Sequence, residues 1–219
     1  MERIPEPELM DDPAQARAYA AADFSEPHDR FVALFGECFP GIAVTGPVLD
    51  LGCGPGDIAC RFAQAHPRCS VLGVDGSDAM IAEGERLVTA RGLAGRIRFH
   101  RARLPCALPG GPYATVICNS LLHHLRDPAV LWETLRAAAA RGARVLVMDL
   151  LRPATEQRAR ELVTRYAGDE PEILRRDFFH SLLAAYRPEE VWGQLEAARL
   201  SHLRIQVVSD RHFIVHGCL

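Results

Sequence analysis

The sequence contains no lysine, so every cationic side chain other than histidine is an arginine. A Walker-type phosphate-binding loop requires a lysine after its glycines, and this chain therefore cannot contain one. Asparagine is nearly as scarce, because Asn119 is the single example in 219 residues. A residue type that is kept only once has either a function or a chance origin, and the composition leaves both alternatives open.

Long apolar runs are also missing, since no segment approaches the roughly 18–20 residues that span a bilayer. The acidic N-terminus has no apolar core of a secretion signal. The seven cysteines include no CxxC pair, a pattern typical of reduced thiols. The net charge of −3 gives no long-range attraction to nucleic acid or anionic membranes. We therefore expect a cytoplasmic protein that binds neither nucleic acid nor membrane.

Apolar segments of strand length alternate with amphipathic helical segments along most of the chain. Strands are indicated at 48–51, 70–75, 96–102, 113–120 and 143–151, and a hairpin at 203–217. Helices separate most of these segments, including one over 127–142, with a proline near its start and a glycine at its end. This alternation predicts a mostly parallel sheet that is covered by helices on both faces.

A glycine loop follows the first strand, in the stretch VLDLGCGPGD at 48–57. Glycines let a ligand approach the backbone, and the following helix start offers unpaired N–H groups. A dinucleotide fingerprint would need a glycine at position 57, where Asp57 would instead repel a pyrophosphate. The remaining pattern is D-x-G-x-G-x-G, from Asp50 to Gly56. An ordinary tight turn between strand and helix is the alternative, but it does not explain Asp50.

This pattern resembles motif I of the class I S-adenosylmethionine-dependent methyltransferases, and further motifs follow in the family's order to about residue 150. The resemblance implies a doubly wound, mostly parallel, seven-stranded α/β sheet of the Rossmann-like methyltransferase fold, with an antiparallel C-terminal hairpin strand. It also implies S-adenosylmethionine as the cofactor. That ligand carries a sulfonium and an amino group, and an acid beside the loop is favourable for both.

The later motifs extend the cofactor site that the resemblance implies. Asp75 ends the second strand, where a carboxylate accepts ribose hydroxyls, although helix capping is an alternative role. Met80 is expected against adenine or in the core. The family's Gly-Asp pair after the third strand is replaced by Ala102-Arg103. Backbone groups of these residues, or stacking of the Arg103 guanidinium, are the alternatives for contacting the adenine. The residues implied to bind the cofactor are Asp50, Gly52, Cys53, Gly54, Gly56, Asp75, Gly76, Ser77, Met80, Ala102, Arg103, Leu104, Asn119 and Ser120.

The stretch NSLLHHLRDP at 119–128 resembles a motif of small-molecule enzymes related to the ubiquinone and menaquinone methyltransferases. His123 lies within a turn of Asn119 and is the candidate catalytic residue, either as a base or as a group that orients the acceptor. A helical ion pair with Asp127 is the plainer alternative. On a helix His123 and His124 would point about 100° apart, so we expect no metal site.

The chain reads as one domain, 1–219, with four parts. These are an N-terminal helical cap (1–46), a cofactor-binding core (47–151), a helical cover (152–187) and a final helix with the hairpin (188–219). Cap and cover are expected to close over the strand ends and to line a substrate pocket. The candidate substrate-binding residues are Tyr19, His28, His124, Arg175, Phe179 and His180.

The implied function is methyl transfer from S-adenosylmethionine to a small-molecule metabolite by direct in-line displacement. The alternative is a protein of the same fold that binds the cofactor without methylating. Such a protein would have a regulatory role or catalyse a different reaction on its substrate. The sequence does not indicate an oligomeric state.

Overall fold

Seven strands form one sheet in the computed structural model, which describes residues 1–6 and 9–219. The strand order is β3-β2-β1-β4-β5-β7-β6. The strands are β1 (Gly46–Leu51), β2 (Cys69–Asp75), β3 (Ile97–Arg101), β4 (Tyr113–Asn119), β5 (Ala139–Leu150), β6 (Arg204–Val207) and β7 (His212–Cys218). The first five are parallel, and β7 runs antiparallel to both β5 and β6. The expected seven-stranded sheet with an antiparallel hairpin is therefore confirmed.

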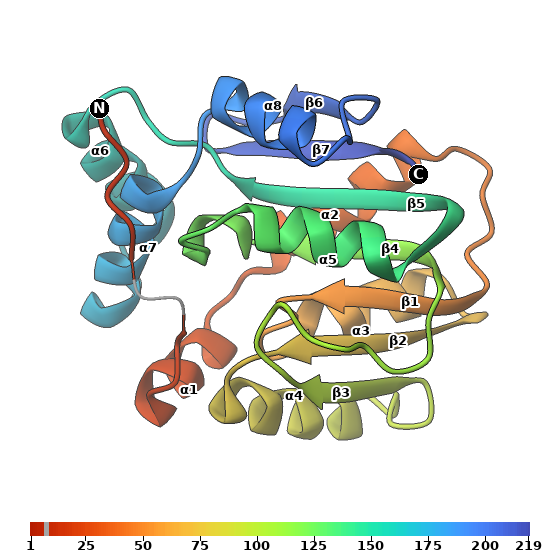
Figure 1. Cartoon of the computed structure of the whole chain (residues 1–219). Helices are drawn as coiled ribbons and strands as arrows, with labels where there is room; N and C mark the ends of the chain where they lie inside the picture. The colour runs from red at the N-terminus through yellow and green to blue at the C-terminus, as the bar shows by residue number, and fades with distance from the viewer. Residues whose placement is uncertain (7–8) are drawn as a thin grey trace.

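Helices cover both faces of this sheet (Figure 1). They are α1 (Pro13–Ala21), α2 (Ser25–Cys38), α3 (Asp57–Ala65), α4 (Asp78–Ala90), α5 (Ala129–Ala138), α6 (Glu156–Ala167), α7 (Glu172–Ala184) and α8 (Pro188–Ala197), with a 3₁₀ turn, η1 (Leu122–His124). Neighbouring strand residues point to opposite faces. Val48 accordingly packs with α2, α3 and α4 in one core, and Leu49 packs with α5 and α8 in the other.

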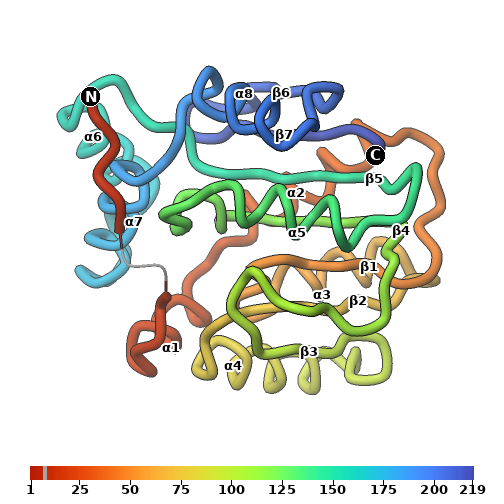
Figure 2. Tube along the Cα trace, viewed as in Figure 1, coloured from red at the N-terminus to blue at the C-terminus, as the bar shows by residue number. Residues whose placement is uncertain are grey.

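The parallel strands end at one edge of the sheet, which is where ligands bind in this class of fold. The strand order reverses between β1 and β4, because β1 is followed in the chain by β2 on one side and β4 lies on the other. Helices α6 and α7 stand across this edge, and the N-terminal segment, residues 1–6, runs alongside them (Figures 1 and 2). Helix α1 packs against both α4 and α7. The edge is thus enclosed by segments from both ends of the chain.

The helix expected over 127–142 is shorter than its sequence suggests. It ends at Ala138, and β5 begins at the next residue, Ala139. Ala139 pairs with Tyr113 of β4, and the register then shifts before Arg144 pairs with Thr115. Pairing with the sheet therefore overrides the helical propensity of the alanine run.

Within the described part of the chain, no helix combines the length and apolar character needed to cross a bilayer.

Candidate functional site

A cavity of about 810 Å³ lies at the strand ends, between the sheet edge and the enclosing segments. Most residues singled out from the sequence line it. They are Tyr19, His28, Asp50, Gly52, Cys53, Gly54, Asp75, Gly76, Met80, Ala102, Arg103, Leu104, Asn119, Ser120, His123, His124 and His180. The structure therefore brings the strand-end residues and the histidine pair into one space.

Four of the residues singled out lie outside this lining: Gly56, Ser77, Arg175 and Phe179. On α7 the lining includes Leu174, Asp177, Phe178 and Ser181, spaced at i, i+3, i+4 and i+7 on one helix face. Arg175 is exposed on another face, and the ring of Phe179 lies under the guanidinium of Arg160 at 4.7 Å. The helical period thus turns Arg175 and Phe179 away from the cavity.

Glycine is required at the three loop positions for different structural reasons. Gly52 has φ +70°, and a Cβ added there would lie 2.8 Å from the Cβ of Leu121. Gly54 has φ +50° and nothing within 4 Å of such a Cβ, so its open side belongs to the cavity. A Cβ at Gly56 would lie 2.8 Å from the ring of Phe99, which shows a packing requirement rather than a ligand contact.

The carboxylate of Asp75 is held by backbone donors on both sides. Its Oδ2 accepts from the N–H of Gly54 and its Oδ1 from the N–H of Ser77, each at 2.9 Å. Burial raises the pKa of Asp75, and these hydrogen bonds oppose the rise. Ser77 itself caps α4, because its hydroxyl accepts from the N–H of Met80. Asp75 therefore presents a fixed acceptor to the cavity, whereas Ser77 has a structural role.

Two buried oxygens at the cavity have no hydrogen-bond partner among the residues that the structure describes: Asp50 Oδ2 and Asn119 Oδ1. Asp50 is 1% exposed, and burial, followed by the charge of Asp75, raises its pKa to about 8. Buried acceptors without donors are costly and rare. Together these atoms fit a ligand that brings hydrogen-bond donors and a positive charge to the ends of β1 and β4.

His123 is held by Asp149 and not by Asp127, so the proposed helical pair with Asp127 is wrong. Its Nδ1 lies 2.6 Å from Oδ1 of Asp149, at the end of β5, and both side chains are 2% exposed. Asp127 instead accepts from the N–H of Ala129 at the start of α5. Burial disfavours the charged imidazole, but the charge and hydrogen bond of Asp149 outweigh it and raise the pKa of His123. The same pairing lowers the pKa of Asp149 despite its burial.

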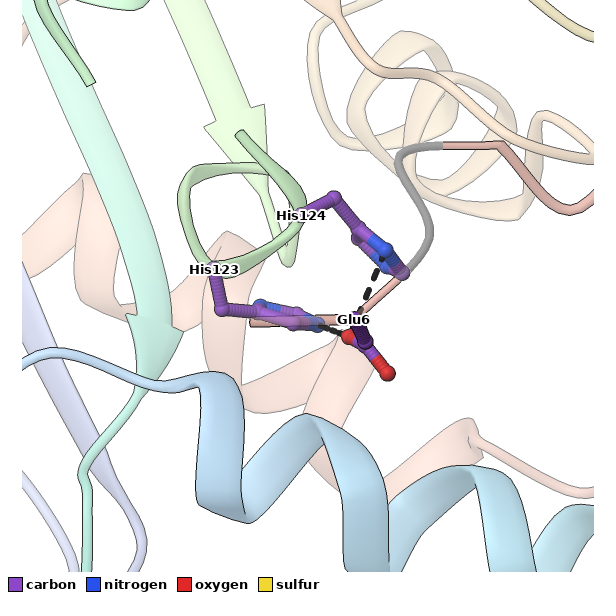
Figure 3. A group of neighbouring side chains, drawn as sticks. All are labelled: Glu6, His123 and His124. Carbon is purple, nitrogen blue, oxygen red and sulfur yellow. Dashed lines mark ion pairs between the residues drawn. The ribbon is translucent and has the colours of Figure 1, made fainter. Parts of the chain in front are cut away.

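The two histidines do not diverge as expected for a helix. They lie on η1, their ring centroids are 4.2 Å apart, and the rings are tilted by 35°. Both face Glu6 of the N-terminal segment (Figure 3). The expectation that the two rings diverge too far to bind one metal ion is therefore wrong, because a 3₁₀ turn replaces the expected helix.

His28 and Tyr19 form the wall on the side of α1 and α2. His28 Nδ1 lies 2.7 Å from Oδ2 of Asp57, which also accepts from Arg61 and Arg91. Burial would raise the pKa of Asp57, but His28 and Arg61 outweigh it and lower this pKa. Burial and nearby carboxylates raise the pKa of Tyr19 to about 12, so its hydroxyl stays protonated. This wall therefore presents an imidazole and a neutral phenol.

Reasoning from the sequence missed Glu6 and Asp149. Asp149 follows the same pattern as Asp50 and Asp75, an acid at the end of an apolar strand, so a signal for it was present. Glu6 has no comparable signal, because it lies outside the helices and strands and 117 residues before His123. Only the fold of the N-terminal segment across α7 brings it to the site.

Comparisons with known proteins agree with this geometry. Residues 48–147 match the family model described as a methyltransferase domain. The trans-aconitate 2-methyltransferase of Methylobacterium nodulans is 28% identical over 130 residues, which cover 59% of this chain and 47% of that protein. A SAM-dependent methyltransferase from Aquifex aeolicus has a TM-score of 0.67 at 18% identity, covering 94% of this chain and 98% of that chain. The plantazolicin methyltransferase in complex with SAH has a TM-score of 0.65 at 13% identity, covering 94% and 95%.

The fold is that of the Rossmann-like methyltransferases. Residues 48–147, somewhat less than half of the chain, match the methyltransferase domain, and the trans-aconitate relative is similar over 130 residues. The Aquifex aeolicus protein is described as SAM dependent, and the plantazolicin methyltransferase is solved in complex with SAH. The aligned part spans less than half the length of the trans-aconitate relative.

The donors and acceptors that line the cavity fit the chemical groups of S-adenosylmethionine. The unpartnered oxygens of Asp50 and Asn119 match an ammonium and a sulfonium, and the fixed carboxylate of Asp75 matches ribose hydroxyls. The open side of Gly54 leaves room for a ligand against the backbone. No acid follows β3 near Arg103, in agreement with the departure from the family pattern.

Proposed function

We propose that the chain transfers the methyl group of S-adenosylmethionine to a small-molecule acceptor. The observation that carries this proposal is the continuity of the cavity. One space of about 810 Å³ contains the acidic strand ends of Asp50 and Asp75 and also the histidine pair, Glu6 and the lining face of α7. A cofactor and a small acceptor can therefore meet inside it.

The cofactor half is assigned to the strand ends. Asp75 accepts the ribose hydroxyls, Asp50 and Asn119 receive the cationic amino-acid end, and Met80 with residues 102–104 borders the base. S-adenosylmethionine supplies a methyl group that is already activated by its positively charged sulfur. The contribution of the chain is then to hold the acceptor in the right place and to exclude water.

The acceptor half is assigned to the segments that enclose the edge. His123 reaches it with Nε2, because Nδ1 is engaged by Asp149. His124, His180, Tyr19 and His28 line the same space. The relatives named trans-aconitate 2-methyltransferase make carboxylic acids the first acceptor class to test, and phenols, thiols and amines follow.

Two measurements test the function. Isothermal titration with S-adenosylhomocysteine and with NAD should show binding of the former alone. Incubation with methyl-labelled cofactor and fractionated metabolite extracts should then give a labelled small product. Binding without any product would contradict the proposal and favour the non-methylating alternative.

The role of His123 is tested by separating turnover from binding. If His123 takes the acceptor proton, His123→Ala lowers the single-turnover rate by roughly 10²–10⁴-fold. If it orients the acceptor, KM for the acceptor rises while the rate at saturation is kept. No change in either quantity would remove His123 from the acceptor site. His202→Ala is the control, because that side chain is exposed and outside the cavity.

A further inference from the structure

Three groups that commonly ligate metals converge in the acceptor half of the cavity. Oε1 of Glu6 lies 3.4 Å from Nε2 of His123 and 3.3 Å from Nδ1 of His124. The three ligand atoms all lie within 4.8 Å of one another, and Figure 3 shows both rings turned toward the carboxylate. For bonds of about 2.0–2.1 Å, a tetrahedral metal site has roughly 3.3 Å between its ligand atoms. Both distances from Glu6 match that spacing.

His123 has the orientation of a metal-ligating imidazole. Asp149 accepts from the N–H groups of Leu122 and Leu150 as well as from Nδ1 of His123. A carboxylate engaged in this way is an acceptor, so Nδ1 keeps its proton toward Asp149, and Nε2, which faces Glu6, is the nitrogen left to bind a metal ion. An imidazole fixed by a carboxylate behind it is the usual arrangement around protein-bound zinc.

Glu6 is also held in place. Ser181 of α7 donates to its carboxylate, at 3.1 Å from Oε1 and 3.3 Å from Oε2. Arg3 ties the same segment to the site, since it donates to the carbonyls of Ala184, His123 and Leu125. Its guanidinium lies 4.1 Å from the ring centre of Tyr186. The segment that carries Glu6 is thus bound to η1 and to α7 by separate contacts.

We propose that Glu6, His123 and His124 form a binding site for a divalent metal ion, with zinc as the best match. Two imidazoles and one carboxylate are a zinc donor set, and three protein ligands leave one position open. All three residues line the cavity, so the open position faces the acceptor half. An acceptor with an ionisable oxygen or sulfur occupies it and releases its proton to solvent. This role for the acceptor rests on the proposed function, whereas ion binding does not.

Metal binding is measured directly on tag-free protein. After treatment with a chelator and its removal, the chain is titrated with ZnCl₂ by calorimetry and with CoCl₂ by visible absorption. We expect one zinc ion per chain and the intense absorption bands of four-coordinate cobalt. His124→Ala and Glu6→Gln should each weaken zinc binding by at least 10-fold, and Asp149→Asn by roughly 10–100-fold. His202→Ala, which removes an exposed histidine elsewhere, should leave it unchanged.

Circular dichroism and thermal melting of each variant separate loss of the site from loss of the fold. If a variant does not fold, the cobalt spectrum of the wild-type chain decides the question. Absence of saturable zinc binding to the wild type would overturn the site, as would binding that His124→Ala leaves intact, because a buried ion pair would then explain the cluster. Methyl transfer that persists in chelator together with absent zinc binding overturns the metal site alone. Zinc binding without any methylated product supports the site and contradicts the proposed function.

Discussion

His123 and Asp149 are 26 residues apart in the chain, yet Nδ1 of one lies 2.6 Å from Oδ1 of the other in a buried pair. The pair links η1, which follows β4, to the end of β5. Asp149 also accepts from the N–H of Leu122 at 2.7 Å, so a single carboxylate fixes both the turn and the ring on it.

Removal of this carboxylate should therefore destabilise the fold. In Asp149→Ala the buried Nδ1 of His123 and the N–H of Leu122 lose their acceptor. We expect the free energy of unfolding to fall by about 3–5 kcal/mol, measured by urea denaturation. Asp149→Asn keeps an acceptor and should lose less. Asp169→Ala, in the exposed turn between α6 and α7, is the control; an equal loss there would contradict the prediction.

Asp75 should contribute strongly to cofactor affinity. Asp75→Ala removes an acceptor that two backbone donors hold in place. The Kd for S-adenosylhomocysteine should rise by roughly 10–150-fold, which corresponds to about 1.5–3 kcal/mol for hydrogen bonds to a charged group. Asp78→Ala, an exposed acid three residues further on that pairs with Arg101, should leave the Kd unchanged. Unchanged titration curves for Asp75→Ala would exclude the ribose role.

Asp50 should make stability depend on pH in the ligand-free protein. Its pKa is raised to about 8 by burial, whereas in the unfolded chain it ionises near pH 4. The folded state therefore binds the extra proton between these values, and its stabilising contribution is lost as pH rises from about 4 to 8. The slope should reach about 1.4 kcal/mol per pH unit.

The isosteric variant Asp50→Asn provides the comparison, because it has no proton to exchange. Urea denaturation at several pH values should show a shallower slope for the variant than for the wild type. The affinity for S-adenosylmethionine should rise with pH up to about 8 in the wild type alone, because the cationic ligand favours the ionised carboxylate. Identical pH slopes in both proteins would show that Asp50 does not titrate in this range.

Gly52 and Gly41 provide a matched test of the glycine loop. Both have left-handed backbone conformations, with φ +70° and +71°, but only at Gly52 would a Cβ meet a neighbour, Leu121. Gly41→Ala should cost about 1–2 kcal/mol of stability from the backbone alone. Gly52→Ala should cost roughly 1–3 kcal/mol more and weaken S-adenosylhomocysteine binding. Equal losses in both variants, with cofactor affinity kept, would show that close approach at Gly52 does not matter.

Local sequence patterns predict the strand positions and the glycine loop, because the formation of these elements depends mainly on neighbouring residues. The run from Val48 to Gly56 places an apolar strand, an acid and glycines in consecutive positions, and the structure has each in that order. The end of α5 was missed, because pairing of Ala139 with Tyr113 is a contact between distant segments. The same limit explains the wrong partner assigned to His123, since Asp127 is near in the chain and Asp149 is near in space.

The sequence by itself determined the alternation of elements, the acids at the strand ends and the family resemblance, since each depends on residues within a few positions of one another. The tertiary structure alone decided which residues meet in the acceptor half of the cavity. Glu6 meets His123 and His124 only because the N-terminal segment crosses α7 and because η1 is a 3₁₀ turn instead of a helix. These contacts join residues more than a hundred positions apart, and they depend on how whole elements pack, which no local pattern records.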